Sequence, residues 1–195
     1  MITCAPLLLA QMLTIITPCS RPENLRGVLQ SIDFNVVSQW IIVHDTKHRP
    51  FIQVFPNDEK IHEYPCTGPP GSTSGNAQRN FGLELVHEGY VYFLDDDNLV
   101  HPNFYTEVVP NLRPKCILTF DMQYANGGVL RGASPRPRQI DTAMVVFDRA
   151  TCAHLRWTLH EYIADGLFIE ALVNLAQDHW TYVPKVAAWY NRLRD

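Results

Sequence analysis

Three consecutive carboxylates, Asp95, Asp96 and Asp97, are the residues whose types and spacing most clearly point to chemistry. They directly follow residues 90–94, an apolar and aromatic run with the pattern of a buried strand. Adjacent carboxylates repel one another, and a divalent cation relieves that repulsion. Mg²⁺ and Mn²⁺ prefer oxygen ligands and commonly bridge to a substrate diphosphate. We therefore predict a metal site here; the alternative is an acidic turn before a helix that begins near Pro102.

The carboxylates need a scaffold, and the hydrophobic pattern predicts one. Apolar runs of strand length alternate with helix-period segments, which is typical of an α/β domain with a mainly parallel sheet. The acidic run then lies at the carboxyl end of a strand, where open α/β sheets bind their ligands. The expected strands are residues 13–17, 40–44, 90–94, 116–120 and 142–147, and the expected helices run from Ser20 to about Ile32, over 76–88, and onward from Asp165.

Composition narrows the possible functions. The chain has 195 residues, of which 46% are hydrophobic and 18% charged, so we expect one domain spanning residues 1–195. A net charge of −4 gives no general attraction for nucleic acid or for an anionic membrane surface. The five cysteines are scattered and include no C-x-x-C pair, which favours a reducing, cytoplasmic location.

The two ends of the chain carry no clear targeting signal. Residues 1–18 are largely apolar, but they lack a basic start and are interrupted by Pro6 and Gln11. We therefore expect no signal peptide, and no run approaches the length of a membrane span. Residues 1–11 are interpreted as an optional extension before Met12. The absence of an expected membrane anchor is compatible with one module of a longer polypeptide.

Four segments, in order, resemble the nucleotide-sugar motifs of GT-A fold glycosyltransferases. They are IITPCSRP at 15–22, WIIVHD at 40–45, NAQRN at 76–80 and FLDDDN at 93–98. The similarity is greatest to inverting enzymes, namely the family 2 type and the family 43 glucuronyltransferases. It implies a single GT-A (Rossmann-like) α/β domain with a mixed, mainly parallel sheet. It also implies metal-dependent transfer of a hexose, with inversion, from a nucleoside diphosphate sugar to a glycan or other hydroxyl acceptor.

The same resemblance bears on the sugar donor. A UDP-sugar is the implied donor, with glucose as the least specific choice. The glucuronyltransferases end their catalytic domain with Trp-His-Thr-Arg, whereas this chain has Trp189-Tyr190-Asn191-Arg192. Because the histidine is missing, glucuronic acid is not the expected sugar.

The resemblance assigns roles to the charged residues of the central motifs. Asp97 matches the last acid of the family's Asp-x-Asp motif and would bind Mn²⁺ or Mg²⁺. Asp95 and Asp96 would bind the ribose or hold the geometry. Arg79 would reach the diphosphate or the sugar as a fixed cation, although a lone arginine on a helix is usually a solvated surface residue.

Residues near the first two strands would form the nucleotide pocket. The resemblance implies that Thr17, Pro18 and Arg21 line it and that Asp45 accepts a hydrogen bond from the base or ribose. The plainer interpretation makes Arg21 a helix-start residue and Asp45 a turn former.

An inverting transfer also needs a carboxylate that deprotonates the acceptor hydroxyl. Related enzymes place it at the start of a late helix, which in this chain is Asp165; an ordinary N-cap residue is the alternative. Glu170 is the second candidate, but on an ideal helix it points about 140° away from Asp165. Asp141 lies in a segment similar to the family's acceptor side, so it would bind an acceptor hydroxyl.

Two other functions remain open, and some loop arginines and late aromatic residues receive no site role. Apolar residues followed by Asp95-x-Asp97 also resemble aspartyl-phosphate phosphohydrolases, in which Asp95 would be the nucleophile. A domain that binds a nucleotide sugar or glycan without turnover is the non-catalytic alternative. Arg138 and its neighbours Arg131 and Arg136 could clamp a diphosphate or an acidic acceptor, but they are interpreted as solvated, as loop arginines usually are. Trp180, Trp189 and Tyr190 are interpreted as core and not as platforms for a sugar.

Overall fold

The computed structural model describes residues 12–56, 58–73, 75–152 and 154–194, so the expected extension over 1–11 lies outside the described residues. The strands are β1 (Leu13–Cys19), β2 (Val37–Asp45), β3 (Ile61–Cys66), β4 (Tyr90–Phe93), β5 (Leu99–Val100), β6 (Ile117–Gln123), β7 (Val129–Leu130), β8 (Val145–Asp148) and β9 (Trp180–Trp189). The helices are α2 (Leu25–Leu29), α3 (Asn76–Leu85) and α4 (Ala164–Leu175), with short 3₁₀ or π turns η1 (Pro22–Asn24), η2 (Phe104–Val108), η3 (Val109–Asn111), η4 (Thr142–Met144), η5 (Arg149–Cys152) and η6 (Gln177–His179).

One mixed sheet connects the two halves of the chain. Its strand order is β3-β2-β1-β4-β8-β6-β9-β5, and β7 pairs with β6. The strands β3, β2, β1 and β4 are parallel, β8 runs against both β4 and β6, and β9 is parallel to β6. The longest pairings are therefore parallel, and the predicted α/β class with a mixed, mainly parallel sheet is confirmed.

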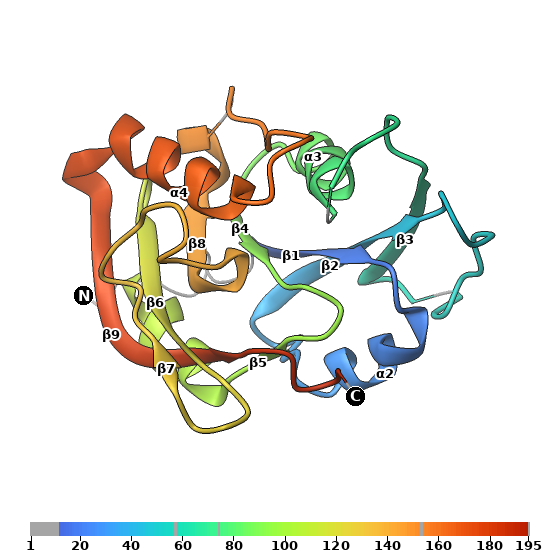
Figure 1. Ribbon diagram of the computed structural model, residues 1–195. Coiled ribbons are helices and arrows are strands. Elements are labelled where there is room, and N and C mark those ends of the chain that lie inside the picture. The colour runs from blue at the N-terminus through green and yellow to red at the C-terminus, as the bar shows by residue number, and fades with distance from the viewer. Residues whose placement is uncertain (1–11, 57, 74, 153, 195) are drawn as a thin grey trace.

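The central strands are buried on both faces because helices cover them. Every residue of β1 and of β4 is buried, as expected for near-continuous apolar runs in a parallel sheet. Figure 1 shows α3 and α4 on one side of the sheet and α2 on the other. Gly82 allows α3 to approach β1 closely, since a Cβ atom there would lie 2.5 Å from Ile16 Cγ2. No helix in the described part of the chain is long and apolar enough to cross a membrane.

All five expected strands exist, with shifted bounds. Besides the two-residue strands β5 and β7, the sequence pattern missed β3 and β9. Both contain a proline, which removes a ladder donor and is tolerated only at an edge or a bulge. Pro65 lies in β3, the outermost strand beside β2, and Pro184 lies in β9 where the register skips from Val183 to Val186. The expected strand over 142–147 begins only at Val145, because η4 occupies its first residues. The helix expected to reach Ile32 ends at Leu29.

Helix α3 is held at both ends by residues from much later in the chain. At its start, Asn76 Nδ2 donates to Thr158 O at 2.9 Å, and near its middle the Asn80 side chain donates to Trp157 O at 3.0 Å and accepts from Trp157 N at 2.8 Å. At its end, Arg149 donates to the carbonyl oxygens of Leu83 and Val86 at 3.1 and 2.8 Å. Residues 157–161, called the strap below, therefore lie along the N-terminal half of α3.

Candidate active site

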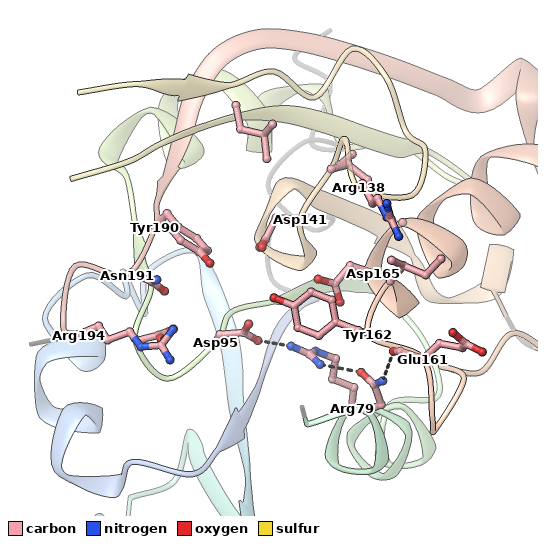
Figure 2. A pocket seen from close by; sticks show the side chains of 16 residues that line it. Arg79, Asp95, Arg138, Asp141, Glu161, Tyr162, Asp165, Tyr190, Asn191 and Arg194 are labelled. Atoms are coloured by element: carbon pink, nitrogen blue, oxygen red, sulfur yellow. Dashed lines mark hydrogen bonds and ion pairs between the residues drawn. The ribbon is translucent and has the colours of Figure 1, made fainter. Parts of the chain in front are cut away.

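The predicted site residues gather at one edge of the sheet. Strands β1, β2 and β4 are parallel, so their carboxyl ends share that edge. Because β8 runs against β4, its beginning lies there too, and β9 ends there because it is parallel to β6. A cleft of about 650 Å³ opens at this edge (Figure 2). Five of the predicted residues line it: Arg79, Asp95, Asp97, Asp141 and Asp165.

Asp96 is the structural anchor of the acidic run. It is only 1% exposed. Its Oδ2 accepts hydrogen bonds from the backbone N–H of Ser20 at 2.6 Å and of Arg21 at 2.7 Å. Its Oδ1 accepts from Arg21 Nε at 3.0 Å and also contacts Nη2. Both oxygens are therefore used within the protein, and Asp96 ties the loop after β1 to the loop after β4.

Asp97 shares the same arginine but keeps one oxygen on the cleft. Arg21 Nη2 donates to Asp97 Oδ2 at 2.8 Å, and Arg194 Nη1 lies 4.0 Å from that oxygen. Burial raises the pKa of Asp97, and the Arg21 guanidinium opposes the shift. Three segments therefore meet at Asp97: the end of β4 carries it, the loop after β1 contributes Arg21, and the segment after β9 contributes Arg194.

Arg79 and Asp95 form the floor of the cleft. Arg79 is buried on the first turns of α3, and its Nη2 donates to Asp95 Oδ1 at 2.6 Å. Its Nη1 donates to Asn76 Oδ1 at 3.0 Å, and its guanidinium carbon lies 4.9 Å from the centre of the Trp157 ring. This arginine is therefore a fixed cation inside the cleft and not a solvated surface residue.

Asp165 and Asp141 form the opposite wall. Asp165 lies on the first turn of α4 and is not its N-cap, which is Ile163. Asp141 caps η4, where its Oδ1 accepts from Ala143 N at 3.0 Å. Burial raises the pKa of both carboxyl groups. The Asp95 carboxylate adds to the shift at both, and the Arg79 guanidinium opposes it at both. This wall therefore holds protons more tightly than ordinary aspartates do.

A glycine next to Asp165 allows this wall to form. Gly166 faces the loop before β8, and a Cβ atom on it would lie 2.2 Å from Pro137 Cα. The start of α4 and the segment that carries Asp141 can approach one another only because that atom is missing. Glu170, the second candidate base, instead lines a separate hollow with Arg136 and Trp180.

The expected divalent cation would need oxygen ligands from the residues of the cleft. In the described part of the chain, no group of three His, Cys, Asp or Glu side chains could enclose an ion. Asp95 Oδ2 and Asp97 Oδ1, however, have no hydrogen-bond partner among the described residues, and both side chains line the cleft. Mg²⁺ is commonly held by one or two carboxylates plus substrate phosphates. The two oxygens fit such an ion when a diphosphate completes its coordination.

A groove continues from the cleft toward β2. A hollow of about 150 Å³ shares Arg79 and Asp95 with the cleft and is also lined by Pro18 and Asp45. Beyond it, a hollow of about 220 Å³ has Asp45 and His44 in its wall. The expected nucleotide residues Pro18 and Asp45 thus lie in one groove with the acidic run.

Thr17 differs from the expectation for the nucleotide pocket. Its side chain is fully buried, and its hydroxyl accepts a hydrogen bond from Trp40 Nε1 at 2.8 Å. Because alternate residues of a strand face opposite sides, this side chain points into the core while its neighbour Pro18 reaches the groove. The Thr17 side chain therefore does not line the groove.

The lining residues that received no site role include two tyrosines and two arginines, namely Tyr162, Tyr190, Arg138 and Arg194. Tyr190 and Arg194 follow the proline-interrupted strand β9, so the sequence pattern did not place their segment. Arg138 has a φ of +67° and lies in the loop before β8, and Tyr162 lies directly after the strap. The only sequence signal for this group was the cluster of arginines in the loop 125–137, which was interpreted as solvated.

Comparisons with known proteins found likeness in structure but not in sequence. No model of a protein family matches the chain, and no curated protein matches it. Solved structures of S. aureus TarS do match. TarS residues 1–349 align with a TM-score of 0.72 at 15% identity, covering 91% of this chain and 59% of that one. The same segment in complex with UDP-GlcNAc has a TM-score of 0.71 at 15% identity, covering 91% and 57%.

A third match is TarS 1–349 in complex with UDP, with a TM-score of 0.72 at 15% identity, covering 91% and 59%. The chain therefore spans somewhat more than half of the length of these structures. At this identity the likeness shows the fold, which is the GT-A fold expected from the sequence. It does not assign the chain to family 2 or to family 43.

Proposed function

We propose that the protein is a glycosyltransferase that moves a hexose from a nucleoside diphosphate sugar, a UDP-sugar in the first instance, to a hydroxyl acceptor. The observation that carries this proposal is that one cleft has carboxylates on two facing walls. Asp95 and Asp97 offer free oxygens on one wall, and Asp165 lies on the other. The solved complexes of the similar TarS with UDP and UDP-GlcNAc support the choice of donor.

The groove indicates how the sugar donor would lie in the site. The nucleoside would occupy the hollows beside Pro18 and Asp45, where Asp45 is half-buried and can accept a hydrogen bond. The diphosphate would then reach the acidic run, with Arg79 and Arg194 as nearby cations. Glucose is the least specific choice for the hexose.

Asp97 and Asp95 would hold Mn²⁺ or Mg²⁺ together with the diphosphate. When bound, the ion neutralises charge on the departing diphosphate. Asp96 has no part in this contact, because Ser20 and Arg21 occupy its oxygens; it positions Asp97 through their shared arginine.

Asp165 would act as the base. Its carboxylate accepts the proton of the acceptor hydroxyl while that oxygen bonds to the anomeric carbon and the bond to the diphosphate oxygen breaks. Attack from the wall opposite the diphosphate inverts the anomeric centre. Asp141, on the same wall, would accept a hydrogen bond from an acceptor hydroxyl.

The geometry gives less support to the phosphohydrolase alternative. A nucleophilic Asp95 would have to attack while one of its oxygens is ion-paired with buried Arg79. Such enzymes also use a lysine, and no lysine is among the described residues that line the cleft. A non-catalytic binding domain would bind the same nucleotide sugar, but it would have no use for Asp165.

The test measures nucleoside diphosphate release from UDP-, GDP- and dTDP-sugars with Mn²⁺, Mg²⁺ or EDTA. The wild type should release one nucleotide in a metal-dependent way, because water can slowly replace the acceptor. Asp97→Asn should abolish release, and Asp165→Asn should abolish transfer while retaining nucleotide binding. Glu170→Gln is the matched control, since its carboxylate lies outside the cleft. Absence of both release and nucleotide binding in the wild type would refute the proposal.

A further inference from the structure

Tyr162 is an exposed aromatic residue at the mouth of the cleft. Its exposed fraction is 87%, the highest among the large hydrophobic side chains of the described residues. It nevertheless lines the cleft, and Figure 2 shows its ring projecting into the space between the two walls. Tyr190 contributes a second ring from the segment after β9. Leaving an aromatic face in water forgoes the gain from burial, so a ligand that covers this face would gain affinity.

The strap holds Tyr162 in place from its N-terminal side. Thr73 N donates to Leu159 O at 2.7 Å, and His160 Nδ1 lies 3.0 Å from Gly71 O. These bonds fasten the strap to the loop 66–75, in addition to its bonds with α3. On the C-terminal side, Ile163 begins α4 as its N-cap. The ring is therefore presented by an ordered backbone, which lowers the entropy cost of binding.

The charge of the cleft selects against an anionic acceptor. Its carboxylates are Asp95, Asp97, Asp141, Glu161 and Asp165, and its guanidinium groups are Arg79, Arg138 and Arg194. Arg79 is already paired with Asp95, and Arg194 lies beside Asp97. A diphosphate that arrives with a divalent cation adds little net charge. With Asp141 holding its proton, the far wall still has the carboxylates of Asp165 and Glu161 against the guanidinium of Arg138, so it stays net negative. Such a wall repels anions and offers hydrogen-bond acceptors to neutral hydroxyl groups.

We infer that Tyr162 is the platform on which a neutral pyranose ring of the acceptor stacks, with the attacking hydroxyl directed toward Asp165. This inference rests on the proposed function and specifies its acceptor class. One face of a pyranose carries C–H groups that pack on an aromatic ring, while its rim carries hydroxyl groups. The cleft matches both features, because Tyr162 supplies the apolar face and Asp141 and Asp165 supply the acceptors.

The direct test uses neutral methyl glucoside, galactoside and mannoside without any sugar donor, with sorbitol as the acyclic control. Saturation-transfer NMR should show at least one methyl glycoside receiving magnetisation from the protein, and sorbitol should receive much less. Tyr162→Ala should abolish the signal, whereas Tyr162→Phe should retain it because it keeps the ring. Leu175→Ala is the matched control, since Leu175 is exposed on α4 outside the cleft. The inference is overturned if no glycoside binds or if Tyr162→Ala binds like the wild type.

A kinetic test separates this inference from the proposed function. With the active sugar donor, Tyr162→Ala should raise the KM of the best methyl glycoside about ten-fold, the equivalent of about 1.4 kcal/mol, and change the donor KM far less. A methyl glucuronide should be a poorer acceptor than the glucoside. A better glucuronide, or equal changes in both KM values, would overturn the inference while leaving the transferase intact. Absence of nucleotide release in every variant would instead refute the proposed function. The NMR result would still show whether Tyr162 binds a neutral glycoside.

Discussion

The two walls of the cleft use the same residue type in opposite electrostatic settings. In the acidic run, Asp95, Asp96 and Asp97 are each within ion-pair distance of a guanidinium, from Arg79 or Arg21. Asp141 and Asp165 have no ion pair within 4 Å in the part of the chain that the structure describes. Arg79 reaches them only through space, and burial raises their pKa values.

Under the proposed function, this difference would separate two tasks of an aspartate. A carboxylate that is paired on one oxygen remains a fixed ligand with a defined direction. A carboxyl group that is desolvated and poorly compensated gains proton affinity, which suits it to take a proton from a hydroxyl. The following predictions test whether the two walls differ in this way.

The largest expected effect concerns the weakly paired wall. Asp165→Asn removes the proposed base without changing the side-chain shape, so transfer should fall by about 10³-fold. Nucleotide binding, followed as a thermal shift with UDP and Mn²⁺, should stay near the wild-type level. Transfer within ten-fold of the wild type would show that the walls do not divide the work as described.

The next effect concerns stability in the paired wall. Asp96→Asn leaves Arg21 paired with Asp97 alone and gives the backbone N–H groups of Ser20 and Arg21 a neutral, poorer acceptor in a buried position. We expect a loss of about 3 kcal/mol in the free energy of unfolding, measured with urea. Asp58→Asn is the control, because Asp58 is exposed and should change stability by less than about 0.5 kcal/mol. Equal losses in both variants would contradict the anchoring role of Asp96.

A smaller effect should appear in the pH dependence of stability. The raised pKa of Asp141 means that the folded protein keeps a proton that the unfolded chain releases. The stability from that proton is complete below the ordinary aspartate pKa of about 3.9 and is lost as pH rises through the raised value. Urea unfolding at intervals above pH 4 should show this decline, by about 1 kcal/mol or more. In Asp141→Asn the decline should be weaker, and an unchanged profile would exclude Asp141 as its source.

The smallest expected effect tests whether the Thr17 side chain lies outside the groove. Thr17→Val removes the acceptor of the Trp40 indole N–H while keeping the side-chain shape, so stability should fall by about 1 kcal/mol. The donor KM should stay within two-fold, since the Thr17 side chain faces the core. Asp45→Asn provides the contrast, because Asp45 lines the groove. A large rise in donor KM for Thr17→Val would show that this position does contact the nucleotide.

Much of the fold could be predicted because its central strands are continuous apolar runs. Residues 90–94 and the acidic run after them predicted both β4 and the end of it at which the cleft lies, since the carboxyl edge of such a sheet is a general ligand site. The pairing of these acids could not be predicted. Whether Asp96 faces Ser20 and Arg21 depends on how the loop after β1 folds across β4, and this contact joins residues 76 positions apart.

The far wall was harder to predict for two physical reasons. Pro184 interrupts the pattern of β9, so the segment that carries Tyr190 and Arg194 to the cleft had no assigned strand before it. The strap has no periodic pattern at all, because its position depends on side chains of α3 such as Asn80. Asp165 was identified only through a family resemblance, and Tyr162, three residues before it, carried no signal.

The two ends of helix α3 have a consequence for the order in which the chain can mature during synthesis. The helix and its arginine emerge from the ribosome early, but Arg149 and Trp157 emerge some seventy residues later. Until then, the last carbonyl groups of the helix lack the guanidinium that bonds them, and Arg79 lacks the ring beneath it. The part of the sheet that α3 covers therefore cannot reach its final form ahead of the segment 149–157. We expect a nascent chain stopped before residue 149 to remain protease-sensitive in the region of α3.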